Sequence, residues 1–376
     1  MDSSPPAALP DVCSPEPAIP DVSIIVPARN EEANIGACLK SLASQTGVAF
    51  EIIVVDDSSA DRTREIAESI AGVRVIFPDP LRESWTGKNN ALVSGAKEAR
   101  AAWLLFTDAD TVHHPGSLAR ALDETKKQRA DLLSYSPEQV VVSFAERAVM
   151  PVIFAQLAAQ YPPEKVRDPN SGIAAANGQY ILVRRKAYDA VGRHAAVATE
   201  ILEDVALARR FRNAGKLVYF RYGGDAVRTR MYRSWSQLRE GWTKNLALLF
   251  SQPQWLALRT LSLWLIAWSA LGVAVIGAAR QHFAWIALAV FWLLLYWRIR
   301  AANFATPNNL IAMAFGPPIF AYLLLRSKQA HANGQVSWKG RTYDMGVSRT
   351  ERTDPIERKA TDLIPRIESE KLRTEN

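Results

Sequence analysis

Cysteine and compact basic clusters are both scarce in this sequence of 376 residues. The two cysteines, Cys13 and Cys38, provide neither a disulfide framework nor the spacing of a metal site, so the composition is consistent with a reducing cytoplasm. The net charge is +7, but no Lys/Arg run with interleaved aromatic residues occurs, which makes nucleic acid the least favoured partner. The motifs G-x-G-x-x-G and G-x-x-x-x-G-K-[ST] are also lacking, so neither a Rossmann nor a P-loop phosphate site is indicated.

The first 20 residues contain neither a positively charged segment nor an apolar one, so they do not predict a signal peptide. Their Pro, Ser and Ala content is typical of a flexible leader. The hydrophobic content of the whole chain, 48%, is too high for disorder and high for a purely soluble domain. Changes in composition predict a leader over 1–20, a catalytic domain over 21–254, a membrane region over 255–325 and a basic, charged cytoplasmic tail over 326–376.

Short apolar runs alternate with helix-like periodicities along the predicted catalytic domain. The runs predict four strands, at 22–27, 50–57, 73–77 and 102–110. Strands that alternate with helices predict βαβ units, and hence an α/β protein with a parallel sheet covered on both faces. Ligands of such sheets bind beyond the carboxyl ends of the strands.

Two carboxylates, Asp108 and Asp110, stand at the carboxyl end of the fourth predicted strand. Side chains at i and i+2 of an extended chain point the same way, so the pair can converge on one cation. Mg²⁺ and Mn²⁺ suit such a pair, because they combine one or two carboxylates with substrate phosphates. A solvated acidic turn is the alternative interpretation. His113 or His114 could add a ligand, although a loop histidine is more often structural.

Other charged residues also fall at strand ends or helix starts. Asp56 and Asp57 can accept hydrogen bonds from a nucleotide base or ribose. Lys88 follows a glycine at a predicted helix start, where it can contact phosphate or simply lie exposed at a cap. Glu203 and Asp204 stand near the beginning of another predicted helix, where acidic residues also serve as helix caps.

Three apolar segments follow the catalytic region, at 261–279, 283–297 and 309–325. The first has no charge and nearly the length that spans a bilayer, and the second is flanked by tryptophans. One such segment could be a buried core helix, but three within about 70 residues favour a membrane region. A Gly-Pro-Pro sequence at 316–318 breaks the third segment, which therefore either crosses the bilayer, is re-entrant or lies in the interface.

The distribution of positive charge predicts the topology. Arg298 and Arg300 follow the second apolar segment, and residues 326–349 contain five Lys or Arg against one Asp. The positive-inside rule then places the catalytic domain, the loop at 298–308 and the tail in the cytoplasm. These features predict a multi-pass protein of the cell inner membrane.

Apolar residues at helical spacing, among them Ile153, predict a helix over 144–161. This helix is either ordinary core or an interfacial element beside the site. In the second case its apolar face would meet the membrane and help a lipid acceptor to reach the active site.

The order and spacing of these blocks resemble the family-two nucleotide-sugar glycosyltransferases with the GT-A fold. The resemblance rests on VSIIVPARNE, VVDDSSADRT, GKNNAL, TDAD, ANGQ and LEDVALARRFRNAG, in that order from residue 22 to about residue 250. The chain is most similar to lipid-modifying members, including ceramide glucosyltransferase-like and hopanoid- or carotenoid-associated enzymes, and VSWKGRTY at 336–343 resembles the tail of ceramide glucosyltransferases. The resemblance implies a mostly parallel, open GT-A sheet with helices on both faces, followed by C-terminal membrane helices.

The resemblance also implies roles for individual residues. Those expected to bind the nucleotide sugar are Pro27, Arg29, Glu31, Asp56 or Asp57, Lys88 and Asp108. Asp110, together with Asp108, would hold the metal that bridges the diphosphate, and Asp204 would be the general base. Those expected beside the acceptor are Asn177, Gly178, Gln179, Glu203 and Trp242.

One departure from the family pattern concerns the diphosphate contacts. Many members carry Q-x-x-R-W after the base, whereas this chain has QLREGWTKN at 237–245, with Gly241 in place of the arginine before Trp242. Arg230 and Arg233 are therefore the candidates for contacting the diphosphate. The departure also argues against processive synthesis of a long polysaccharide.

Taken with the resemblance, these features predict a membrane-associated inverting glycosyltransferase dependent on Mg²⁺ or Mn²⁺. It would move a sugar from a nucleotide donor, a UDP-sugar above all, to a lipid hydroxyl or carboxyl at the cytoplasmic face. One alternative is a polysaccharide synthase, which should need more membrane helices. The other is a catalytically inactive nucleotide-sugar-binding membrane module, against which Asp110 and Asp204 argue.

Overall fold

The computed structural model describes residues 19–277, 282–334, 336–338 and 341–343. The predicted leader and most of the predicted tail therefore lie outside the described residues. Two compact units make up the chain. The first joins the residues up to Arg233 with Leu293–Ala314, and the second joins Ser234–Trp292 with the residues from Phe315 onward.

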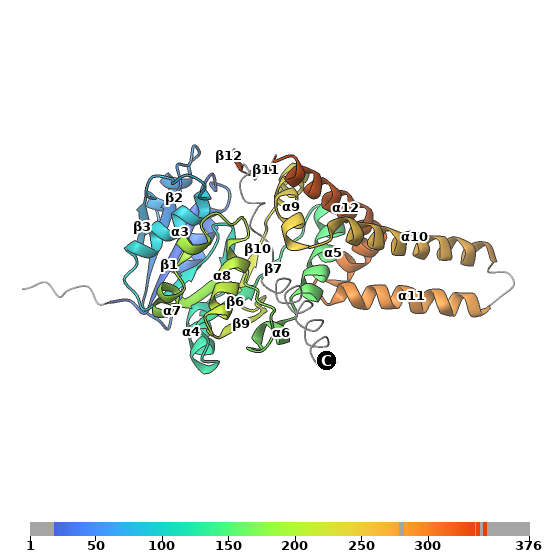
Figure 1. Ribbon diagram of the computed structural model, residues 1–376, viewed down its shortest axis with the longest axis horizontal. Helices are drawn as coiled ribbons and strands as arrows, with labels where there is room; N and C mark the ends of the chain where they lie inside the picture. Colours follow the sequence, from blue (N-terminus) through green and yellow to red (C-terminus); the bar gives the residue numbers. More distant parts are fainter. Residues whose placement is uncertain (1–18, 278–281, 335, 339–340, 344–376) are drawn as a thin grey trace, which may run out of the picture. The chain divides into compact units, whose positions relative to one another are not determined.

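A seven-stranded sheet forms the centre of the first unit (Figure 1). Its strands, in spatial order, are β3 (Val73–Ile76), β2 (Phe50–Asp56), β1 (Val22–Ala28), β4 (Trp103–Phe106), β8 (Ile181–Arg184), β6 (Leu132–Ser136) and β9 (Val218–Tyr222). Neighbouring strands among β1 to β4 run parallel, as do β6 and β9, whereas β8 is antiparallel to both β4 and β6. The predicted α/β class with a mostly parallel sheet is confirmed. The fourth strand is shorter than predicted, because it ends at Phe106 and leaves Asp108 and Asp110 in the loop beyond it.

Helices cover both faces of this sheet, because the strand residues are apolar on both sides. Ile24 and Val26 belong to one buried cluster, and Ile25 belongs to another on the opposite face. The first cluster includes residues of α1 (Ile35–Ala43), α2 (Thr63–Glu68) and α4 (Ser117–Lys127). The second includes residues of α3 (Gly87–Glu98), α7 (Arg185–Ala190) and α8 (Glu203–Asn213). A period of two along buried strands thus gives two cores, one on each face.

Helix α3 lies unusually close to the sheet. A Cβ atom on its Gly95 would lie 2.6 Å from a side-chain carbon of Ile25 and 2.9 Å from one of Val55. Any larger residue at this position would push the helix outward. This close packing therefore sets the distance between α3, whose first turn carries Lys88, and strands β1 and β2.

A small second sheet follows the acidic loop. Its strands are β5 (Thr111–His113), β10 (Val227–Thr229) and β7 (Glu138–Gln139), with β10 in the middle. The other helical elements of the first unit are α5 (Phe144–Gln160), α6 (Pro163–Arg167) and the 3₁₀ turn η1 (His194–Val197). Because β5 begins directly after Asp110, the small sheet anchors the far end of the acidic loop.

The helix predicted over 144–161 is present as α5, but its apolar face is not turned toward a membrane at Ile153. The side chain of Ile153 is fully buried, as is that of Val149. A capping box of Ser143 and Glu146 begins the helix, and Phe154 contacts Phe304 with ring centroids 6.0 Å apart. The interfacial interpretation of Ile153 is therefore wrong, because amphipathic spacing alone does not distinguish a protein core from a lipid surface.

The second unit is mainly helical. It contains α9 (Trp235–Leu249), α10 (Pro253–Gly277), the hairpin strands β11 (Val336–Trp338) and β12 (Arg341–Tyr343), and parts of α11 (His282–Arg300) and α12 (Thr306–Ala332). Ser327 of α12 donates a hydrogen bond to the Thr243 carbonyl and accepts one from the Ala247 amide, at 2.6 and 2.8 Å. These bonds fix the C-terminal part of α12 beside α9.

Two of the described helices, α10 and α12, contain stretches long and apolar enough to cross a membrane, at Pro253–Gly272 and Thr306–Ala332. They differ in burial. Of the most apolar 18 residues, 11% are buried in the first stretch and 44% in the second. Exposed side chains of α10 include Trp255, Leu258 and Ile266. Of the two, α10 has the surface expected of a helix that faces lipid.

The Gly-Pro-Pro sequence does not interrupt α12, which continues through Pro317 and Pro318. Each proline removes one amide donor from the helical ladder, but consecutive prolines share the same turn and leave the rest of the ladder intact. The predicted break is therefore wrong. A continuous helix of 27 residues is long enough for a full crossing.

Candidate active site

The loops that follow β1 and β2 are bound to each other at the carboxyl edge of the sheet. The Asn30 amide donates to the Ser59 hydroxyl at 3.0 Å, and the Asn30 side chain accepts from the Ala60 amide at 2.8 Å. The Glu31 amide donates to the Thr63 hydroxyl at 2.7 Å. Asn30 has a positive φ of 52°, a conformation that asparagine tolerates better than most residues. The two predicted nucleotide-binding loops thus form one structural element.

Arg29 and Asp57 lie on this element and contact each other. The Arg29 guanidinium donates to the Asp57 carbonyl at 2.8 Å and lies 3.9 Å from its carboxylate. Pro27 lies within β1, opposite Val55 of β2, and is half-buried. The structure therefore brings Pro27, Arg29 and Asp57 together at one end of the sheet.

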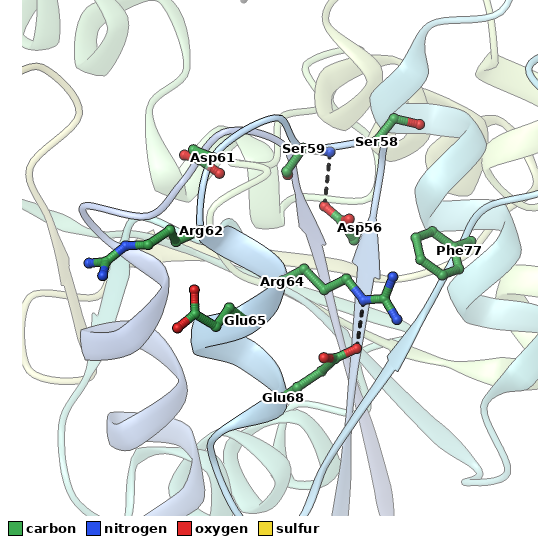
Figure 2. A pocket seen from close by; sticks show the side chains of 9 residues that line it. All are labelled: Asp56, Ser58, Ser59, Asp61, Arg62, Arg64, Glu65, Glu68 and Phe77. Atoms are coloured by element: carbon green, nitrogen blue, oxygen red, sulfur yellow. Dashed lines mark hydrogen bonds and ion pairs between the residues drawn. The ribbon is translucent and has the colours of Figure 1, made fainter.

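A pocket opens beside Asp56, on the side of β2 that faces β3 (Figure 2). Its lining residues are Asp56, Ser58, Ser59, Asp61, Arg62, Arg64, Glu65, Glu68 and Phe77. Asp56 is buried, and its carboxylate accepts a hydrogen bond from the Ser59 amide at 3.2 Å. The guanidinium of Arg64 lies 4.8 Å from the centre of the Phe77 ring. Asp56 therefore faces a hollow that has both charged and aromatic walls.

Lys88 lies in the first turn of α3, whose start is capped by the Thr86 hydroxyl. Its ammonium nitrogen lies 2.8 Å from a carboxylate oxygen of Asp108 and 2.8 Å from one of Glu203. Burial alone would lower the pKa of Lys88, but these two carboxylates raise it well above its usual value. Lys88 is therefore a permanent cation that joins the acidic loop to the start of α8.

The acidic loop holds Asp108 and Asp110 between β4 and β5. The Thr111 hydroxyl donates to the Asp108 carbonyl at 2.7 Å, and the Thr229 hydroxyl donates to the Asp110 carbonyl at 3.1 Å. Both aspartates are partly exposed, although Oδ1 of Asp110 is buried. Two such carboxylates are the oxygen donors that a divalent cation combines with substrate phosphates.

No group of three or more His, Cys, Asp or Glu side chains in the described part of the chain could hold a metal ion. His113 is buried, and its Nε2 lies 3.1 Å from the hydroxyls of both Thr107 and Thr111. Burial lowers the pKa of His113 to about 3, so the ring is neutral. A metal at this loop would therefore rely on the two aspartates and on phosphate oxygens of the substrate.

Thr107 and Thr111, which flank the acidic loop, were not predicted from the sequence to be functional. They connect the acidic loop to the predicted acceptor segment. Thr107 donates to the Gln179 carbonyl at 2.8 Å, while Thr111 donates to the Asp108 carbonyl. Since both hydroxyl protons are used, Nε2 of His113 must donate to these oxygens, which fixes its tautomer. Cys38 also reaches the Asp108 carbonyl, at 3.7 Å. The only signal in the sequence was the hydroxyl residues that flank the acids.

Asp204 lies in the first turn of α8, where its carboxylate accepts the Gly178 amide at 2.9 Å and the Val205 amide at 2.8 Å. Removal from water, and then the charge of the neighbouring Glu203, raise the pKa of Asp204 to about 6. A Cβ on Gly178 would lie 3.1 Å from Nζ of Lys88 and 3.3 Å from Glu203. The absence of a side chain at residue 178 therefore leaves the space between this residue, Lys88 and Glu203 unfilled.

The remaining candidates are distributed over both units. Asn177 accepts the Gln179 amide at 3.0 Å, so the turn at 177–179 lies next to Asp204. Arg230 pairs with Glu146 at 3.4 Å, and Arg233 donates to the Asn34 side chain at 2.7 Å. The final candidate, Trp242, is buried within α9 of the second unit. The structure therefore assembles one cluster around Lys88, whereas the two arginines contact other partners.

A family model described as Glycosyl transferase family 2 matches residues 23–192. Similar proteins include 4,4'-diaponeurosporenoate glycosyltransferases of Staphylococcus aureus. That of strain MRSA252 is 29% identical over 337 residues, which cover 86% of this chain and 88% of the relative. That of strain USA300 is 28% identical over the same length.

Similar solved structures include two glycosyl-transferring enzymes. A mannosyltransferase from Pyrobaculum calidifontis in complex with GDP-Man and Mn²⁺ is 18% identical, with a TM-score of 0.49, and the match covers 83% of this chain and 87% of that chain. Glucosyl-3-phosphoglycerate synthase from Mycobacterium tuberculosis in complex with Mn²⁺, UDP-glucose and phosphoglyceric acid is 19% identical, with a TM-score of 0.42 and coverage of 62% and 79%.

The family match and the curated relatives define an enzyme of the nucleotide-sugar-dependent glycosyltransferase class. The matched part of the chain runs from β1 to α7 and contains the acidic loop and Lys88. Over this domain the chain is therefore similar to glycosyl transferase family 2.

Proposed function

We propose that this protein transfers a sugar from a nucleotide donor to a lipid acceptor of the carotenoid type, with inversion at the sugar carbon. The observation that carries the proposal is the cluster of Asp108, Lys88, Glu203 and Asp204 at the carboxyl edge of the sheet. Asp108 and Lys88 suit the diphosphate of a donor, and Glu203 and Asp204 suit an acceptor. The carotenoid-type acceptor is inferred from the name of the S. aureus relatives.

The donor would occupy the β1 and β2 loops, with its diphosphate near Lys88. The nucleotide part would contact Pro27, Arg29 and Glu31 and meet Asp56 or Asp57. The permanent positive charge of Lys88 would favour the leaving diphosphate as its negative charge develops. Arg230 and Arg233 would reach the same phosphates only by exchanging their present partners, Glu146 and Asn34.

Asp108 and Asp110 would hold a divalent cation, Mg²⁺ or Mn²⁺, together with the diphosphate of the donor. Their residue types and partial exposure fit that role. When bound, such a cation neutralises charge on the leaving group. Thr111 would keep the loop in place because it binds the Asp108 carbonyl, and Thr107 would join the start of the loop to the Gln179 carbonyl.

Asp204 would act as the general base on a hydroxyl acceptor. Its carboxylate would take the hydroxyl proton while the acceptor oxygen forms a bond to the sugar carbon and the bond to the diphosphate breaks. With a pKa of about 6, Asp204 is ionised at neutral pH and still a better proton acceptor than an ordinary aspartate. Asn177, Gly178, Gln179 and Glu203 would border the acceptor.

A carboxyl acceptor differs from a hydroxyl one at this step. A carboxylate has no proton to give, so it would not need Asp204 as a base, and it would bring a third negative charge beside Glu203 and Asp204. Lys88, which lies 2.8 Å from Glu203, would offset part of this charge, and the name of the S. aureus relatives is that of a carboxylate, so both acceptor types are tested. The Asp204→Asn variant distinguishes the two, because it would abolish transfer to a hydroxyl and would preserve transfer to a carboxylate.

The membrane would serve as the source of the acceptor. The exposed apolar side chains of α10 support a location at a membrane, and the positive charges near the ends of α11 and α12 support a cytoplasmic catalytic domain. The inner membrane and a multi-pass topology belong to this proposal. A lipid acceptor would then reach the site without crossing water.

The experiment uses the full chain, purified in detergent. UDP-glucose and GDP-mannose are supplied in turn with a hydroxylated or a carboxylated carotenoid, and the products are identified by mass spectrometry. The proposal expects a glycosylated carotenoid and an equal amount of nucleoside diphosphate. Release of nucleoside diphosphate without any glycosylated lipid, with every acceptor, would contradict it.

A further inference from the structure

The segment that leads into Asp204 has no regular structure between η1 and α8. A loop before a reacting group needs external contacts to hold that group in place. Here the contacts come from the first turn of α3, the turn that also carries Lys88. The Thr86 amide donates to the Ala198 carbonyl at 2.9 Å.

The side chain of Asn89 supplies the other contacts. Its amide nitrogen lies 3.0 Å from the Val197 carbonyl, 3.1 Å from the Ala198 carbonyl and 3.1 Å from the Glu200 carbonyl. Asn89 is completely buried. The side-chain amide of Asn89, the residue next to Lys88, therefore binds three backbone carbonyls of the segment that leads into α8.

We propose that Asn89 is a positioning residue for Asp204. By binding the carbonyls of residues 197, 198 and 200, it joins the first turn of α3 and the segment that leads into α8 into a single rigid element. Lys88 adds an ion pair to Glu203 within the same element. The group that faces the donor diphosphate and the group that faces the acceptor are thereby held at a fixed separation.

Chemistry explains why an asparagine fits this place. Its amide nitrogen has two hydrogens, and these can be shared among several carbonyls that converge on one point. Leucine has a similar size but no donor, and aspartate would present negative oxygens to three carbonyl oxygens. Both substitutions leave buried backbone acceptors without this donor, so the segment before α8 should move.

Asn90 provides a matched control on the same helix. It is also buried, and its amide also donates to a backbone carbonyl, that of Asp79, at 2.6 Å. Asp79 lies in the loop after β3, and it contacts Ser94 and Lys97 farther along α3. Removing either amide costs stability, but only the loss of Asn89 should disturb the general base.

The test compares Asn89→Leu with Asn90→Leu in the full-length protein, with UDP binding and thermal unfolding measured for each. The inference rests on the proposed role of Asp204, so Asp204→Asn is measured in the same assay. Asn89→Leu should lower kcat for sugar transfer by ~10- to 10²-fold, since small misplacements of reacting groups cost rates of this order. The dissociation constant for UDP should change less than about twofold, because the donor loops are untouched.

A second readout is the pH profile. The acid limb of kcat reports the ionisation of Asp204, and it should move away from its wild-type midpoint in Asn89→Leu but not in Asn90→Leu. If Asn89→Leu does not fold, Asn89→Ser replaces it, because the hydroxyl keeps one donor, and it should show an intermediate loss of kcat. Equal kcat and equal pH profiles for the variants of Asn89 and Asn90 would overturn the inference. Full activity of Asp204→Asn would instead overturn the proposed general base.

Discussion

Lys88 and Glu203, which lie in the first turns of two different helices, are joined by an ion pair of 2.8 Å. The same ammonium lies 2.8 Å from Asp108 in the acidic loop. The donor side and the acceptor side of the proposed site thus share one positive charge. This relationship leads to predictions about charge, ionisation and metal dependence.

Replacing Lys88 by Met should lower the rate of nucleoside diphosphate release by about 10²-fold, as the loss of one preorganised electrostatic contact commonly does. The change removes the positive charge and leaves Asp108 and Glu203 without their common partner. Lys88→Arg should retain part of the activity, because it keeps the charge. Lys97 of the same helix pairs with Asp79, and Lys97→Met is the control that should keep the wild-type rate. Equal rates for the two Met variants would remove Lys88 from the mechanism.

The pH profile of sugar transfer to a hydroxyl acceptor should have an acid limb with a midpoint of about 6, the pKa of Asp204. Below this pH Asp204 holds a proton and cannot accept another, so the rate falls as the pH decreases. The charge of Glu203 raises this pKa, whereas Lys88 lowers it. Glu203→Gln removes the first influence, so the limb should move to lower pH. If the midpoint of the acid limb in Glu203→Gln stays at the wild-type pH or moves to higher pH, the assignment of this limb to Asp204 is wrong.

Removal of divalent metal should abolish transfer, and addition of Mg²⁺ or Mn²⁺ should restore it. Asp110→Asn should reduce transfer in the same way and should require a higher metal concentration, because one of the two carboxylates is lost. The control is Asp189→Asn, since Asp189 is exposed on α7 and pairs with Arg193. Wild-type activity in EDTA, or in Asp110→Asn, would refute metal binding at the acidic loop.

The full chain should sediment with membranes and resist washing at alkaline pH. Ile266, exposed on α10, tests whether that helix inserts. Ile266→Arg should reduce the membrane-bound fraction, because arginine at the centre of a span costs about 3 kcal/mol on insertion scales. Ser262→Ala on the same helix should have no effect. Membrane binding that is unchanged in Ile266→Arg would mean that α10 does not cross the bilayer.

Much of the sheet could be predicted from the sequence, because each of the first four strands is a short apolar run followed by polar residues. Asp108 and Lys88 were both recognised from their places after a strand and before a helix. Their contact with Glu203 could not be predicted, since it depends on how α8 packs beside α3. Tertiary contacts between distant segments leave no periodic signal.

Other features were missed or misread for physical reasons. The role of Asn89 was not visible, because an asparagine in a helix is exposed in one protein and buried in another. Ile153 has the same spacing in an amphipathic helix whether its face meets lipid or protein. Pro317 and Pro318 suggested a break, yet the helix continues, since two adjacent prolines disturb only one turn.

The most direct test of the central claim is mass spectrometry of lipid extracts from cells that contain the wild-type protein, the Asp204→Asn variant or no copy of the gene. The account predicts an apolar lipid that carries one added sugar only with the wild-type protein. It further predicts that the unglycosylated form accumulates with Asp204→Asn, whose transfer rate should be at least ~10²-fold lower. Identical lipid profiles in all three cases, with the wild-type protein present and folded, would contradict the claim that this enzyme glycosylates a lipid.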